Sequence, residues 1–202
     1  ILLIILLILL TEFTNKILDI NDLLYSTLVE KLTNQQIENL MDFQNNWAWV
    51  SYLIIPFFLL IKISFIATVL YVGTFFYSKI KVPFKQLWDI VLKSEFVFLL
   101  VSVFKIIWFY FFQTNYTLED LQYFYPLSAL NIIGYKGLEP WFIYPFQILN
   151  LFEFAYWLIL SYYIGKATET NMDNGFKIVA TSYGPALFLW VAVVMFFTLN
   201  YS

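Results

Sequence analysis

Residues 50–77 read VSYLIIPFFLLIKISFIATVLYVGTFFY, and this stretch decides the class of the protein. It is a long apolar run that a single charged side chain, Lys62, interrupts. An α-helix needs about 20 predominantly apolar residues to cross the hydrocarbon core of a bilayer. The stretch therefore predicts a membrane-spanning helix.

Further apolar stretches predict spanning helices at residues 96–112, 141–165 and 176–199. The run ILLIILLILL at residues 1–10 rises only about 15 Å as a helix, which is roughly half a hydrocarbon core. We interpret it as part of a first span. The alternative is the apolar core of a signal peptide, although no basic segment or small-residue cleavage site is visible.

Composition supports an integral membrane protein of the all-α class. Hydrophobic residues make up 61% and charged residues 12% of the 202 residues, whereas a soluble domain carries about 25% charged residues. A soluble fold of this size cannot bury so much apolar surface, so lipid must be part of its solvent. We expect one domain over residues 1–202, a bundle of about five transmembrane helices with amphipathic interfacial or extramembrane helices.

Several function classes are excluded by the residues that are missing. The net charge is −3 and every basic residue is a lysine, so no basic stripe exists to neutralise nucleic-acid phosphates. The chain has no Cys and no His, which removes disulfides, thiol nucleophiles and the usual transition-metal ligands. We therefore expect no nucleic-acid partner, no metal, no cofactor and no enzymatic activity.

The segments between the predicted spans differ in charge, which predicts their orientation. Residues 78–94 carry four lysines against one acid, residues 11–48 two lysines against six acids, and residues 114–140 one lysine against three acids. Lysine-rich connections stay in the cytoplasm. The first of these segments is thus expected inside and the other two outside, with the N-terminus inside and the C-terminus outside.

These segments also carry helical patterns. Within the outer segment 11–48, Thr33 and Gln36 form a predicted capping box that opens a helix. Residues 120–134 predict a short external helix ended by Gly134. Pro83 suits the first turn of an amphipathic helix in the cytoplasmic interface, where lysines meet anionic headgroups. The lysines of this expected lipid interface are Lys79, Lys81, Lys85 and Lys93, and the apolar face is Phe84, Leu87, Trp88, Val91 and Leu92.

Three charged residues lie near the middle of predicted spans: Lys62, Lys105 and Glu153. A charge at the bilayer centre costs at least ~2.5–3.5 kcal/mol, so pairing inside the bundle is expected. Our hypothesis is that Glu153 pairs with Lys62, Lys105 or both. Gln147 and Asn150, each three residues before the next polar position, would extend this intramembrane polar network along one helix face.

This network has two interpretations. It is either an ion path, a proton path or a polar-substrate site, or it is a buried pair that fixes helix register. We favour the structural interpretation, because a pump needs more groups than one carboxylate without His and without a broken-helix pair. Ser102 and Lys105 match a Ser-x-x-Lys nucleophile spacing, but they lie inside an apolar helix with no accompanying motif, so we do not interpret them as catalytic.

The layout resembles the Yip (Ypt-interacting-protein domain) family of five-span membrane proteins, in its bacterial branch. The resemblance rests on the order of the spans and on three segments: FKQLWDIVLKSEF at 84–96, YPLSALNIIG at 125–134 and SYYIGKATETNMDNGFKIV at 161–179. It implies a bacterial cytoplasmic (inner) membrane, with the N-terminus inside and the C-terminus outside. Eukaryotic members imply membrane trafficking with small GTPases, whereas bacterial members have no settled role.

We expect a non-enzymatic scaffold or accessory subunit of a larger membrane complex, with membrane lipids and other membrane proteins as partners. Residues 11–46 and 79–93 would be its docking surfaces. One alternative is a permease or transporter subunit that uses Lys62, Lys105 and Glu153. Another is membrane shaping through the interfacial helix at 83–93. A transporter predicts a water-lined cavity that reaches Glu153, and a scaffold predicts a dry, packed bundle.

Overall fold

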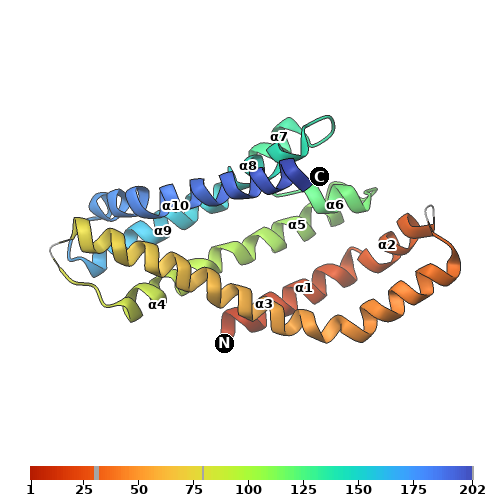
Figure 1. The fold of residues 1–202 in the computed structure, drawn as a ribbon, viewed down its shortest axis with the longest axis horizontal. Coiled ribbons are helices and arrows are strands. Elements are labelled where there is room, and N and C mark those ends of the chain that lie inside the picture. The colour runs from red at the N-terminus through yellow and green to blue at the C-terminus, as the bar shows by residue number, and fades with distance from the viewer. Residues whose placement is uncertain (30–31, 79, 202) are drawn as a thin grey trace. The chain divides into compact units, whose positions relative to one another are not determined.

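The computed structural model describes residues 1–29, 32–78 and 80–201, and every regular element in this part of the chain is a helix (Figure 1). The all-α prediction is confirmed. Lys79 of the expected lipid interface lies outside the described residues, as do Glu30 and Lys31. The helices are α1 (Leu2–Ile17), α2 (Ile20–Val29), α3 (Asn34–Tyr77), α4 (Phe84–Ser94), α5 (Leu99–Phe111), α6 (Leu118–Tyr123), α7 (Ala129–Ile133), α8 (Pro140–Ile148), α9 (Leu151–Ala167) and α10 (Met172–Tyr201), with a 3₁₀ turn at Glu95–Phe98 between α4 and α5.

The chain divides into two compact units. Unit 1 comprises Ile1–Leu60 and Val101–Phe124, and unit 2 comprises Ile61–Leu100 and Tyr125–Ser202. Both α3 and α5 therefore contribute residues to each unit.

Unit 1 has a small aromatic and aliphatic core. Leu18, Phe109 and Leu121 are its buried centre, and the Phe109 ring packs edge-on against Tyr116 at 4.9 Å between centroids. At the start of α3 the backbone N–H of Thr33 donates to Gln36 Oε1 at 3.1 Å, which is half of the predicted capping box. The other half is absent from the hydrogen bonds of the described residues.

Unit 2 is organised around the hairpin of α9 and α10, with α8 against α10 and α4 against α9. The two hairpin helices approach closely at Gly175, where an added Cβ would lie 2.0 Å from the Ser161 carbonyl oxygen. The α3 part of unit 2 buries a stripe at helical spacing, consisting of Ile63, Ile66, Ala67, Leu70 and Thr74. Glycine is thus needed where backbone meets backbone.

Two of the described helices, α3 and α10, are long and apolar enough to span a membrane. The 44 residues of α3 extend about 66 Å at the usual rise of about 1.5 Å per residue, which is more than twice the ~30 Å of a hydrocarbon core. The structure joins the end of the predicted outer segment 11–48 to the predicted span 50–77 in this one helix. The predicted span 96–112 is a 3₁₀ turn followed by α5, which has 13 residues.

The predicted external helix at 120–134 is in fact two helices, α6 and α7. A complete capping box opens α6, in which Thr117 Oγ1 accepts from the Asp120 N–H at 3.2 Å and Asp120 Oδ2 accepts from the Thr117 N–H at 2.9 Å. Gly134 ends α7 as predicted, with φ +83° in the left-handed region.

Candidate functional site

The predicted polar stripe on residues 141–165 does not lie on one continuous helix. The chain leaves the helical conformation between α8 and α9, and Asn150 has extended backbone angles, φ −139° and ψ 160°. Its side-chain Oδ1 accepts from the Glu153 N–H at 2.7 Å, and its Nδ2 donates to the Gln147 carbonyl at 2.8 Å and the Ile148 carbonyl at 3.0 Å. The expectation of an uninterrupted helix was wrong because one asparagine caps both helix ends.

The backbone groups that this break exposes are paired with the segment before α7. The Ala129 N–H donates to the Leu149 carbonyl at 2.8 Å, and the Leu151 N–H donates to the Leu127 carbonyl at 3.2 Å. Leu127 has φ +56°, an uncommon conformation for a branched residue. This short antiparallel bridge satisfies the polar groups of a broken helix, which an apolar environment requires.

Glu153 lies one turn beyond the break and is 9% exposed. Its Oε1 accepts two hydrogen bonds, from the Tyr183 hydroxyl at 2.8 Å and from the Trp157 indole N–H at 3.0 Å. Tyr183 belongs to α10, whereas Glu153 and Trp157 belong to α9. The carboxylate therefore ties the two helices of the hairpin together.

The hypothesis that Glu153 pairs with Lys62 was wrong, because Lys62 pairs with another carboxylate. Lys62 donates to Glu95 Oε2 at 2.8 Å, and no ion pair to Glu153 occurs among the described residues. Glu95 stands in the 3₁₀ turn between α4 and α5 and is 4% exposed. Its second oxygen, Oε1, has no hydrogen-bond partner within the described part of the chain.

Aromatic rings join these two polar contacts into one cluster, which we call the polar cluster: Lys62, Glu95, Glu153, Tyr156, Trp157 and Tyr183. The Lys62 ammonium lies 4.4 Å from the centroid of the Phe98 ring and 5.9 Å from that of Tyr156. Tyr156 is fully buried, and the centroid of its ring lies 5.6 Å from that of the Tyr183 ring. Rings thus fill the space between the two carboxylates.

Lys105 belongs to unit 1, whereas the residues of the polar cluster belong to unit 2. Its ammonium donates to the backbone carbonyl of Leu121, the residue that begins the last turn of α6. The lysine thus meets a helix-terminal carbonyl within its own unit, a favourable partner for a cation, and the Lys105–Glu153 pair stays a prediction.

The lysines of the expected lipid interface are exposed where the structure describes them. Lys81, Lys85 and Lys93 all face solvent, and the hydrogen bond from Lys93 to Asp89 raises the pKa of Lys93, so this side chain keeps its charge. Leu87, Ile90 and Val91 of α4 are buried, whereas Phe84, which belongs to the predicted apolar face, is 43% exposed. Trp88 is half-buried and donates to Ser64 Oγ at 3.2 Å.

No family model, curated protein or solved structure matches this chain. The resemblance to the Yip family therefore stays a prediction from the order of the apolar stretches and the three segments.

Four residues of the polar cluster were not predicted from the sequence: Glu95, Tyr156, Trp157 and Tyr183. Glu95 directly follows the lysine-rich connection 78–94, and one more charged residue next to such a connection does not indicate a buried carboxylate. The available signal was its position immediately before the apolar run that begins at Phe96. The three aromatic residues carried no signal of their own, because aromatic residues make up 22% of the chain.

Proposed function

We propose that the chain is a polytopic membrane protein, not an enzyme, that acts as a scaffold or accessory subunit of a larger membrane complex. It would lie in a bacterial cytoplasmic membrane with about five spans, its N-terminus inside and its C-terminus outside. Its partners would be membrane lipids and other membrane proteins, without a cofactor. The Yip-like layout and the charge bias of the connections support this placement.

The observation that carries the proposal is an exposed apolar face, mostly aromatic, on the first part of α3. Leu40, Phe43 and Trp47 follow one another at helical spacing and are 46%, 62% and 54% exposed. The rings of Phe43 and Trp47 lie 5.9 Å apart. If α3 crosses the bilayer with residues 50–77, this face lies outside the hydrocarbon core. Exposed apolar side chains gathered on one face suit an interaction site, and tryptophan is enriched at the energetic centre of interfaces.

The packing of the polar cluster supports the same proposal. Glu153 already has two hydrogen-bond donors, and the rings of Phe98 and Tyr156 pack at 5.0 Å beside the Lys62 ammonium. A cluster whose charged groups are already paired with other helices suits a structural role, in which polar contacts fix helix register.

Native purification tests the scaffold proposal. The tagged chain in mild detergent is expected to retain a partner membrane protein, and F43A/W47A is expected to lose it. The exposed polar pair Gln44 and Asn45, replaced by alanine, is the matched control on the same helix and should retain the partner. Recovery of a monodisperse single species from wild-type membranes would contradict the proposal.

A transporter subunit is the second candidate, and the break between α8 and α9 favours it. Broken helices commonly build binding sites in transporters, and Glu153 lies one turn after this break. The two candidates differ in the effect of Glu153→Gln. In a scaffold the variant weakens folding and assembly together, whereas in a transporter it assembles normally and loses transport or growth complementation.

A further inference from the structure

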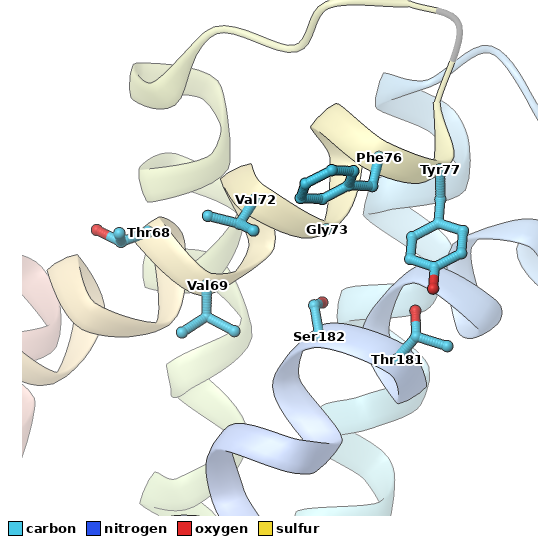
Figure 2. A pocket seen from close by; sticks show the side chains of 8 residues that line it. All are labelled: Thr68, Val69, Val72, Gly73, Phe76, Tyr77, Thr181 and Ser182. Atoms are coloured by element: carbon cyan, nitrogen blue, oxygen red, sulfur yellow. The ribbon is translucent and has the colours of Figure 1, made fainter.

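An apolar groove runs between α3 and α10 within unit 2 (Figure 2). Its volume is about 710 Å³, and its lining is Thr68, Val69, Val72, Gly73, Phe76, Tyr77, Thr181 and Ser182. The helices approach closely at Gly73, where an added Cβ would lie 2.6 Å from the Ser182 side chain. Figure 2 shows this glycine opposite Ser182, with Tyr77 pointing toward Thr181 at one end.

The threonine and serine hydroxyl groups that line the groove already donate within their own helices. Thr68 Oγ1 donates to the Ser64 carbonyl at 2.8 Å, Thr181 Oγ1 to the Lys177 carbonyl at 2.7 Å, and Ser182 Oγ to the Ile178 carbonyl at 2.6 Å. An occupant therefore needs no hydrogen-bonding groups of its own along this wall. The groove suits a hydrocarbon.

Its dimensions favour lipid acyl chains over a partner helix. The α3 wall from Thr68 to Tyr77 rises about 13 Å, which is close to the ~15 Å of one leaflet's hydrocarbon. A helix of the same length is a cylinder about 10–12 Å wide and fills roughly 1,000–1,500 Å³, more than the groove offers.

A second pocket of about 450 Å³, whose lining includes two charged side chains, continues from the Tyr77 end of the groove. Tyr77 lines both, and the pocket adds Lys177 together with Glu169, which sits in the left-handed conformation at φ +52°. Within the described part of the chain neither side chain has an ion-pair partner. The pocket thus presents one cation and one anion at the mouth of a leaflet-deep apolar groove.

We propose that this groove and pocket bind one phospholipid whose headgroup carries both a phosphate and a primary ammonium, as phosphatidylethanolamine does. Lys177 pairs with the phosphate and Glu169 with the ammonium, while the acyl chains lie along Val69, Val72 and Phe76. The charge pair matches this zwitterion better than an anionic headgroup, because Glu169 repels a second negative charge. The site rests on the proposed insertion of α3 and α10 in a membrane.

Lipid retention tests the site. The chain is reconstituted in phosphatidylcholine nanodiscs that contain phosphatidylethanolamine or phosphatidylglycerol, and retained lipid is counted by native mass spectrometry. Wild type is expected to retain one phosphatidylethanolamine in preference to the other two lipids. Lys177→Gln should lower its occupancy about fivefold, and Val72→Trp, which fills the groove, should abolish retention. Glu169→Gln should remove the preference over phosphatidylcholine, whose quaternary ammonium donates no hydrogen bond.

Two control variants accompany these measurements. Lys166→Gln removes an exposed charge from the end of α9 outside the pocket, and Val193→Trp adds the same bulk on an exposed part of α10. Both should retain the lipid as wild type does. Equal retention of all three lipids, or equal losses in the control and test variants, would overturn the site. Alkaline carbonate extraction of the same variants separates the two proposals, because a chain that is extracted refutes membrane insertion itself.

Discussion

Lys62 and Glu95 form an ion pair whose two members differ in exposure. The side chain of Glu95 is 4% exposed and that of Lys62 is 45% exposed, with 2.8 Å between Nζ and Oε2. Lys62→Met leaves a buried carboxylate without its cation, so we expect a loss of about 1–3 kcal/mol in the free energy of unfolding, less than for a fully buried pair. Glu95→Met should cost less, because the exposed lysine can find other partners.

A double-mutant cycle in detergent checks this expectation. The double variant K62M/E95M should be more stable than Lys62→Met alone, since no unpaired buried charge remains. Lys85→Met, which removes an exposed lysine of the same unit, is the control and should change stability by less than ~0.5 kcal/mol. Additive losses in the double variant would show that the pair contributes no coupling.

Glu153 tests whether hydrogen bonds between α9 and α10 hold the hairpin together. Tyr183→Phe removes the donor at 2.8 Å and leaves Glu153 with Trp157 as its side-chain donor. A hydrogen bond to a charged group contributes about 1.5–3 kcal/mol, and a loss of this size is expected in thermal unfolding. Tyr162→Phe, on a 54% exposed tyrosine of α9, is the matched control. If the two variants are equally stable, the hydrogen bond to Glu153 does not stabilise the hairpin.

At the scale of elements, Asn150 decides where α8 ends and α9 begins. Asn150→Ala removes the acceptor for the Glu153 N–H and both donations to the last carbonyls of α8. Loss of an N-cap costs about 0.5–2 kcal/mol, and we expect the upper end because the residue also caps the preceding helix. Hydrogen exchange should accelerate at residues 149–153. Asn131→Ala, on an exposed asparagine of α7, should change neither measurement.

The close crossing of α9 and α10 requires glycine at position 175 of α10 more than at position 184. An added Cβ at Gly175 would lie 2.0 Å from a backbone oxygen, whereas at Gly184 it would meet the Trp157 ring at 3.0 Å. Backbone cannot yield as a side chain can, so Gly175→Ala should destabilise by about 1–3 kcal/mol. For Gly184→Ala the change in stability should be near zero, because alanine is more favourable than glycine in a helix by about 1 kcal/mol, which offsets the contact with the ring. Chemical denaturation of both variants measures the difference, and equal effects would contradict the close crossing.

At the scale of the whole molecule, the helical class was predictable because hydropathy and composition act over long windows. Glu153 was also predictable as a buried polar residue, since one carboxylate stands out in an apolar run. Its partners were not, because Tyr183 and Trp157 come from positions that only the hairpin brings together. The helix break was missed for a related reason. Asn150 fits a polar stripe and a helix cap equally well by spacing, and the Leu127–Ala129 segment that pairs with the break is distant in sequence.

The number of spans is the property on which the proposed function depends most, and the chain is well suited to measure it. It contains no cysteine, so single cysteines can be introduced at exposed positions and labelled with a membrane-impermeant maleimide. Five spans predict labelling of Asp22→Cys and Glu119→Cys in intact spheroplasts, but of Lys85→Cys and Lys166→Cys only after lysis. If α3 and α10 alone span the bilayer, residues 85, 119 and 166 lie on one side. Glu119→Cys therefore decides between the two arrangements, because it reacts together with Asp22→Cys in the first and together with Lys85→Cys in the second.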